Sequence, residues 1–166
     1  LFDTIRRMLS AQVHDVIDEL KTLIHNTTIT VEQVQICIRD GELLARPTAL
    51  PSADPDGRPM WQKLMVHTSE ADHHDGVPIH RALVRKLWES HAASGATVVR
   101  GIWGYYGGHK PHGDAIIQFR RQVPVTTTVI DTPDRIQDAF DIVDEVTGRR
   151  GLVSSELVPA LITSST

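Results

Sequence analysis

The sequence predicts a protein of the α+β class, in which an antiparallel sheet carries two helices on one face. Three observations support this prediction: apolar runs with the alternation or β-branched content of strands, two segments with helical apolar spacing, and the order of these segments. With 166 residues and 40% hydrophobic content, the chain is long enough to bury roughly 70% of its unfolded surface. This length fits one ordinary domain with some additional chain.

The first 60 residues precede that main domain. Apolar residues recur with helical spacing between Val13 and Ile24, and Ile29 to Ile38 alternates as a strand. We therefore expect residues 1–46 to form a helix and a strand. Residues 47–60 are rich in proline and contain Asp-Pro-Asp-Gly, a turn sequence, which indicates a linker.

A complete domain is expected over residues 61–166. Its predicted elements are a strand at 63–67, a helix at 78–91, strands at 96–102, 115–119 and 123–130, a helix at 136–146 and a strand at 152–161. Asp75 is a candidate N-cap of the first helix, and Gly95 and Gly148 are expected to end the two helices. Trp88, on the first helix, is expected to lie in the core.

Strand, helix, strand, loop, strand, helix, strand is the order of the split βαβ, or ferredoxin-like, sandwich. Because both helices of this motif lie on one face of the sheet, apolar residues on the opposite face need a partner, and oligomerisation is expected.

The sequence also contains an internal repeat. The segment V-H-D-V-I-D-E-L from Val13 aligns with I-Q-D-A-F-D-I-V from Ile136, and I-T-V-E-Q-V from Ile29 aligns with V-S-S-E-L-V from Val153. One interpretation is coincidence between two amphipathic units. The other is that residues 1–46 are the last helix and strand of a first copy of the domain, whose opening half would precede Leu1.

Composition excludes several classes of function. The net charge of −4 and the absence of a basic stripe argue against nucleic acid as the main partner. No apolar stretch approaches the roughly 20 residues of a membrane span. Cys37 is the single cysteine, which fits a reducing compartment such as the cytoplasm. No nucleophile elbow or His-Glu-x-x-His motif is present, so an enzyme is not expected.

The stretch from Gly95 to Asp114 is the strongest candidate for a functional site. An apolar run opens there into a glycine-rich segment, and glycines let successive backbone N–H groups approach an anion closely. The alternative is a flexible hairpin whose glycines only serve turns. Candidate ligand-binding residues in this stretch are Arg100, Gly101, Gly104, Gly107, Gly108, His109 and Lys110.

Two further sets of residues remain open between a structural and a functional interpretation. Arg149 and Arg150 follow the second predicted helix, where they are either solvated charges that favour a helix C-terminus or ligands of phosphate oxygens. His109 and His112 are weak candidates for a metal site, because such a site needs three or four converging ligands.

Several motifs of the predicted domain resemble the domain of unknown function 190 family, which is PII-like. These motifs are L-M-V-H-T-S-E-A-D from Leu64, G-V-P-I-H-R-A-L-V from Gly76, G-A-T-V-V-R-G-I-W-G-Y from Gly95, V-P-V-T-T-T-V-I-D from Val123 and G-L-V-S-S-E from Gly151. The resemblance implies a ferredoxin-like fold that assembles as a homo-trimer.

The resemblance also implies a regulatory function. PII-like trimers bind nucleotides in clefts between subunits, so the expected ligand is an adenine nucleotide with Mg²⁺ or a similar small anion. Related proteins bring basic residues from a neighbouring subunit to the phosphates, a role for Arg149 and Arg150 here. The 103–113 loop would change shape and engage a partner protein. The alternatives are a metal-binding, CutA-like protein and a structural or regulatory subunit of an ion transporter that binds no small ligand.

Overall fold

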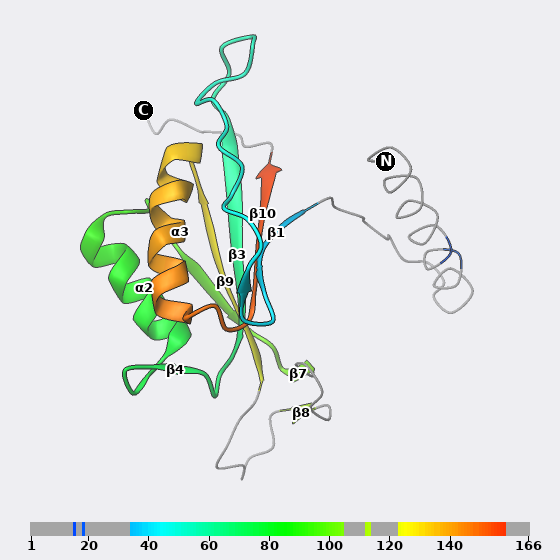
Figure 1. Ribbon diagram of the computed structural model, residues 1–166, viewed down its shortest axis with the longest axis vertical. Helices are drawn as coiled ribbons and strands as arrows, with labels where there is room; N and C mark the ends of the chain where they lie inside the picture. The colour runs from blue at the N-terminus through cyan, green and yellow to red at the C-terminus, as the bar shows by residue number, and fades with distance from the viewer. Residues whose placement is uncertain (1–14, 16–17, 19–33, 105–111, 114–122, 159–166) are drawn as a thin grey trace. The chain divides into compact units, whose positions relative to one another are not determined.

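The computed structural model describes residues 34–104, 112–113 and 123–158, together with Asp15 and Asp18, which are helical. Residues 1–33 and 34–166 form two separate units, and the second contains the sheet. A mostly antiparallel sheet with two helices confirms the α+β class (Figure 1). The predicted helix near 13–24 and the predicted strand at 115–119 lie outside the described residues, apart from Asp15 and Asp18.

The main sheet has six strands in the order β2-β1-β10-β3-β9-β6. Its members are β1 (Gln35–Arg39), β2 (Glu42–Leu43), β3 (Trp61–Ser69), β6 (Thr97–Arg100), β9 (Pro124–Asp131) and β10 (Leu152–Val158). All five pairings in this sheet are antiparallel. From β3 to β10, the large strands and helices follow the order of the split βαβ motif.

Two helices pack on the same face of the sheet (Figure 1). They are α2 (Ile79–Ser90) and α3 (Pro133–Thr147). On α3, the apolar residues that the sequence places on one face of the helix are all buried. They are Ile136, Ala139, Phe140, Val143 and Val146. Gly148 ends this helix in the left-handed conformation with φ 54°, as predicted.

Three expectations about α2 are wrong. Trp88 is 74% exposed, because the buried stripe of α2 runs through Ile79, Leu83 and Leu87, and Trp88 is rotated about 100° from its neighbour Leu87. Asp75 does not cap the helix. It forms a two-residue turn with Gly76, both at positive φ, between β4 (His73–His74) and β5 (Val77–Pro78).

The third wrong expectation concerns where α2 ends. The helix ends at Ser90, and His91 forms the left-handed C-cap four residues before Gly95. The chain after the cap is held by a buried carboxylate. Asp131 is only 2% exposed, and its Oδ2 accepts a hydrogen bond from the Ser94 N–H at 2.6 Å. This contact fixes the path from α2 into β6.

The segment before β3 is bound to the same sheet. β1 pairs with β10, and a bulge between Ile36 and Ile38 lets the neighbours Cys37 and Ile38 both be fully buried. The Gln35 side chain accepts hydrogen bonds from the Thr48 N–H and hydroxyl at 2.8 and 3.0 Å. Gln137 of α3 donates to the Pro47 carbonyl at 2.8 Å. Residues 34–48 are therefore part of the packed domain.

Several connections meet at one end of the sheet, the lower end in Figure 1. β3, β6 and α3 end there, β9 and β10 begin there, and a short hairpin of β7 (Trp103–Gly104) and β8 (His112–Gly113) follows β6. Gly151 is essential to this arrangement. It has φ 87°, and a Cβ at this position would lie 2.2 Å from the backbone oxygen of His67.

We expect the substitution Gly151→Ala to reduce the free energy of unfolding strongly. Its positive φ costs a side-chain residue about 1–2 kcal/mol, and the overlap with His67 adds about 1–3 kcal/mol. Gly57→Ala is a matched control, because Gly57 has φ 78° and open space around its Cβ position, so only the first term applies. Urea unfolding followed by circular dichroism measures both. Equal losses for the two variants would contradict the close approach of Gly151 to β3.

Cys37 provides a chemical test of β1 packing. Burial raises the pKa of its thiol to about 11, and it is the chain's one cysteine. Alkylation by iodoacetamide, followed by mass spectrometry at pH 8, should be at least about 100-fold slower in the native protein than in concentrated urea, because the thiolate is the reactive form. Similar rates in the two states would show that β1 is not stably docked.

Candidate functional site

The candidate site is the end of the sheet where the β6–β7 connection and the α3–β10 loop lie. The described members of the predicted ligand set are Arg100 and Gly101 at the end of β6, Gly104 in β7, and Arg149 and Arg150 after α3. Gly107, Gly108, His109 and Lys110 lie outside the described residues. The structure therefore places both arginine groups at the same end of the domain.

Arg100 closes β6 and is engaged by a carboxylate. Its Nε and Nη2 donate to Oε2 of Glu70 at 3.1 and 2.9 Å, and the two side chains are 31% and 27% exposed. Glu70 directly follows β3, and its N–H donates to the Val123 carbonyl, so the carboxylate comes from a fixed position. An anion that binds Arg100 would share it with Glu70 or displace Glu70.

Gly101 has a structural role. Its N–H donates to the Pro124 carbonyl at 2.8 Å, and a Cβ would lie 3.2 Å from that same oxygen. Glycine is needed here for close contact with β9, and its backbone donor is already used. Gly104 pairs with His112 across the β7–β8 hairpin. Within the described residues, these two glycines therefore support the structural interpretation of the glycine-rich stretch.

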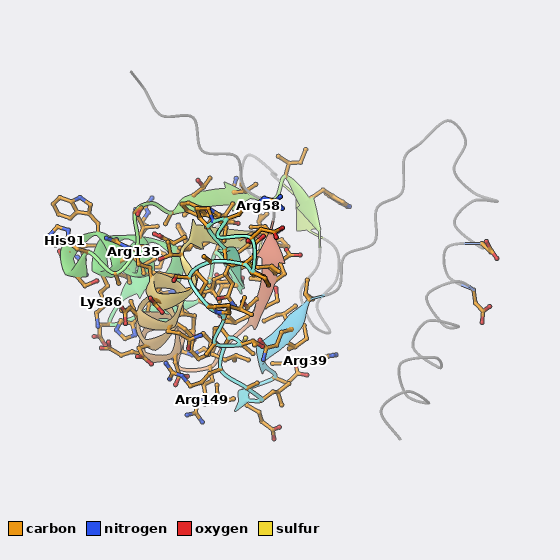
Figure 2. All side chains as sticks on the ribbon, turned by 90° about the horizontal axis from the view of Figure 1, so that it is seen from above. Arg39, Arg58, Lys86, His91, Arg135 and Arg149 are labelled. Carbon is orange, nitrogen blue, oxygen red and sulfur yellow. The ribbon has the colours of Figure 1, made fainter. Side chains whose placement is uncertain are left out.

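The loop after α3 has a strongly defined backbone. Gly148, Arg149 and Gly151 all have positive φ, and the N–H groups of Arg149 and Arg150 donate to the hydroxyl and the carbonyl of Thr147. The Arg149 side chain lies at the periphery of the domain, where its Nε donates to Asp144 Oδ1 at 3.2 Å (Figure 2).

The Arg150 guanidinium differs from the other two, because it donates to the carbonyl of His73 at 2.8 Å. Among the described residues, no carboxylate forms an ion pair with it. A carbonyl oxygen holds the guanidinium in place without neutralising its charge. Among the three predicted arginines, Arg150 is thus the one without a carboxylate partner in the part of the chain that the structure describes.

Arg100 and Arg150 come from strands that are not neighbours. β3 and β9 lie between β10 and β6 in the sheet, so the ends of β10 and β6 are about 14 Å apart at the usual strand spacing. The partners of the two guanidinium groups, Glu70 and His73, are nevertheless only three residues apart in the chain.

The histidines at this end are spread over several elements. Within the described ranges, no three His, Cys, Asp or Glu side chains gather in a way that could hold a metal ion. Burial lowers the pKa of His67, whose Nδ1 lies 3.1 Å from the Thr126 hydroxyl oxygen. The pKa of His80 is also lowered, mainly by burial and then by Arg81.

None of the helices in these ranges combines the length and apolar character that crossing a membrane demands.

Sequence reasoning missed Glu70, Asp144 and the His73 carbonyl as partners of the arginines. Asp144 precedes Arg149 by five residues, and the contact depends on the left-handed turn of the chain at Gly148 and Arg149 after α3. Glu70 is 30 residues from Arg100, and the His73 carbonyl is 77 residues from Arg150. Pairing of β3 with β9 and β10 creates these contacts, and no local pattern predicts them.

The ion pair of Arg100 with Glu70 should couple the two residues energetically. In a double-mutant cycle with Arg100→Gln and Glu70→Gln, we expect a coupling free energy of about 1 kcal/mol that decreases at high salt, because the pair is partly solvated. Urea unfolding of the four proteins measures it. A coupling near zero at low salt would show that Arg100 is not held by Glu70.

Comparison with known proteins agrees with the resemblance found in the motifs. The family model of the domain of unknown function 190, described as uncharacterized ACR, matches residues 61–160. The chain is also similar to a UPF0166 protein of Aquifex aeolicus (strain VF5), with 29% identity over 99 residues, which cover 59% of this chain and 90% of that relative. The matched region begins at β3 and extends past β10. Since it spans more than half of the chain, this protein belongs to the domain of unknown function 190 family.

Proposed function

We propose that the protein is a PII-like regulatory protein that binds a small anionic ligand, an adenine nucleotide with Mg²⁺ in the first instance. It acts through binding rather than catalysis. The ligand lies in clefts between the subunits of a cytoplasmic homo-trimer, with the Arg149–Arg150 loop of one subunit near the β6–β7 connection of the next.

The observation that carries this proposal is that the Arg150 guanidinium is held in place without a carboxylate partner among the described residues. Its guanidinium is held by the His73 carbonyl, and the described residues supply no carboxylate that neutralises it. Its loop is fixed by three successive contacts to the end of α3: Gly148 N–H to Asp144 O, Arg149 N–H to Thr147 Oγ1 and Arg150 N–H to Thr147 O. A preorganised guanidinium suits phosphate oxygens, which it binds in pairs.

The site is placed between subunits because PII-like trimers, which this family resembles, bind nucleotides in such clefts. The face of the sheet opposite α2 and α3 also supports association. It carries Met65 and the 47% exposed Ile130, together with an ion pair of Lys63 with Glu156 whose side chains are 18% and 8% exposed. Burial of such a face against other copies is favourable.

Signalling is assigned to the 103–113 loop. Its two described ends pair as the β7–β8 hairpin, which follows directly on Arg100 and Gly101. Trp103 is 70% exposed at the start of this hairpin, where an aromatic side chain can contact a ligand or a partner protein. A ligand that changes the Arg100–Glu70 contact would alter the position from which this loop starts.

The first test is thermal unfolding with ATP, ADP, AMP, cyclic AMP and S-adenosylmethionine, each with and without Mg²⁺. A ligand at about 100 times its dissociation constant should add roughly 2.7 kcal/mol to the stability. Arg150→Gln should remove most of this gain, because the substitution deletes the phosphate contact and keeps a polar side chain.

Arg58→Gln is the matched control. Arg58 lies in the 51–60 loop at the opposite end of β3, where it pairs with Asp56 at 3.3 Å. This variant should retain the full melting shift. The absence of a shift with every ligand, or an equal shift in Arg150→Gln, would overturn the proposed site and favour the partner-subunit alternative. Sedimentation equilibrium tests the trimer separately.

A further inference from the structure

β6 forms one edge of the sheet. Within the part of the chain that the structure describes, its outer side pairs with no strand. Gly101 donates to the Pro124 carbonyl, so the alternation of an antiparallel ladder directs the backbone groups of Val99 and Thr97 toward β9. The N–H and C=O groups of Val98 and Arg100 consequently point outward, away from the sheet. Val98 thus presents one donor and one acceptor at the middle of the edge.

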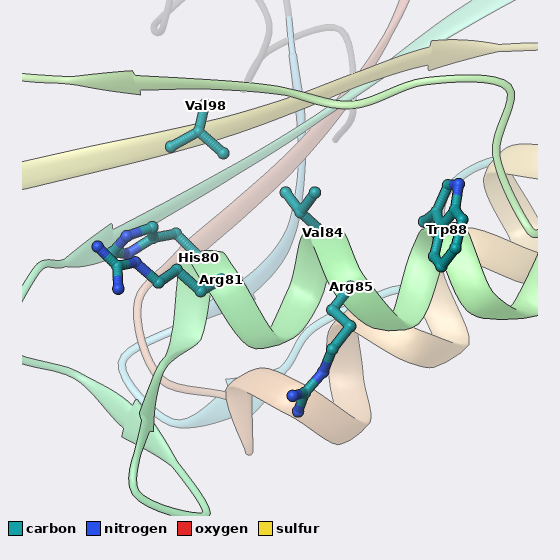
Figure 3. Close-up of a pocket in the computed structure, with 6 residues that line it drawn as sticks. All are labelled: His80, Arg81, Val84, Arg85, Trp88 and Val98. Carbon is teal, nitrogen blue, oxygen red and sulfur yellow. The ribbon is translucent and has the colours of Figure 1, made fainter.

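A groove runs beside this edge, between β6 and the outer side of α2 (Figure 3). It has a volume of about 430 Å³ and is lined by His80, Arg81, Val84, Arg85, Trp88 and Val98. Figure 3 shows Val84 and Trp88 pointing from the helix toward the strand that carries Val98. With Trp88 74% exposed and Val98 37% exposed, this region is an apolar surface that water covers in the single chain.

The charge of the groove has one sign. Arg81 and Arg85 lie among its lining residues, which include no acidic side chain. Within the described residues, neither arginine has a carboxylate partner. The Nδ1 atom of His80 is buried, and it too has no hydrogen-bond partner there. Figure 3 shows Arg85 pointing away from β6, so the groove offers an apolar wall with the basic side chain of Arg81 at one end.

We propose that this surface binds an extended segment of a partner protein that pairs with β6 as an additional strand. Backbone hydrogen bonds to the outer side of β6 at Val98 would supply affinity, and the side chains facing α2 would supply specificity. The chemistry of the groove selects apolar side chains against Val84 and Trp88 and an acidic side chain near Arg81.

The dimensions of the two elements define the required pattern. Arg81 and Trp88 are separated by seven residues of helix, or about 10.5 Å along the axis. Side chains on one face of a strand repeat about every 6.8 Å. Two or three alternate residues of the incoming strand therefore span the groove, with apolar residues at one end and Glu or Asp at the other.

A second copy of this chain is a poorer occupant in a symmetric arrangement. Antiparallel pairing of β6 with β6 of another copy would place both α2 helices on the same face of a continuous sheet, side by side. The basic side chains of the two α2 helices, Arg81 among them, would then be brought together without carboxylates from the groove lining. Like charges in a partly apolar groove oppose this association.

Binding can be measured by fluorescence anisotropy with fluorescein-labelled peptides. The probe is Thr-Leu-Thr-Leu-Thr-Glu-Thr, used together with its reversed sequence because either strand direction can pair. The matched control replaces Glu with Lys. We expect one of the Glu peptides to bind at least about 10-fold more tightly than its Lys counterpart, with the difference decreasing at high salt.

Protein variants separate the contributions of backbone pairing, the apolar wall and the charge of Arg81 to peptide binding. Val98→Pro removes an outward N–H and leaves the ladder to β9 intact, so it should weaken binding at least about 10-fold. Trp88→Ala should have a similar effect through the apolar wall, and Arg81→Gln should abolish the preference for Glu over Lys. Arg58→Gln, at the far end of β3, should change nothing. If Val98→Pro fails to fold, peptides N-methylated at alternate residues test the backbone pairing in its place.

Three results would overturn the proposal. The first is that neither Glu peptide binds at millimolar concentration, and the second is that Trp88→Ala and Arg81→Gln leave peptide binding unchanged. The third is that Val98→Pro abolishes self-association of the protein, which would identify a second copy as the occupant. The surface is distinct from the Arg150 loop. Nucleotide-dependent melting in the Val98→Pro variant therefore reports on the proposed ligand site independently.

Discussion

The alternation of β3 between two faces is the constraint on which the rest of the structure depends. Leu64 and Val66 are almost completely buried under the helices, while Lys63 and Met65 point to the opposite face. A shift of one residue in register would exchange these faces, so burial fixes how β9 and β10 pair with β3. Once this register is set, the ends of the neighbouring strands, and therefore the loops that carry the arginines, take fixed positions.

That register also explains where the arginines of a potential ligand site lie. Gly151 must approach the backbone of His67 closely, which places the α3–β10 loop against the end of β3. Arg100 reaches the same end from the far side of β9 and is bound by Glu70. The domain thus holds both arginines at one end of the sheet, against Glu70 and the His73 carbonyl. In the function we propose, another subunit completes this site.

A second surface arises from incomplete coverage of the sheet. α2 and α3 pack over the centre of the sheet, so the outer strand β6 keeps Val98 partly exposed on the helix side, while Val99 is exposed on the opposite face. Trp88 faces the same region from α2. Edge strands of soluble proteins are commonly protected by charges, bulges or covering elements. An edge flanked by valines and an exposed tryptophan therefore has the properties of an interface, and its arginines define the charge of the segment that would cover it.

The sequence by itself determined the α+β class, the order of the large strands and helices, the buried stripe of α3 and its end at Gly148, because these depend on local periodicity and glycine conformation. It also suggested Arg100, Arg149 and Arg150 as ligand-binding residues, which stays a prediction. Tertiary structure decided that Trp88 is exposed, that Asp75 forms a turn, and which partner each arginine meets. Those outcomes depend on which helix face meets the sheet and on pairing between strands far apart in the chain, and local sequence patterns contain neither.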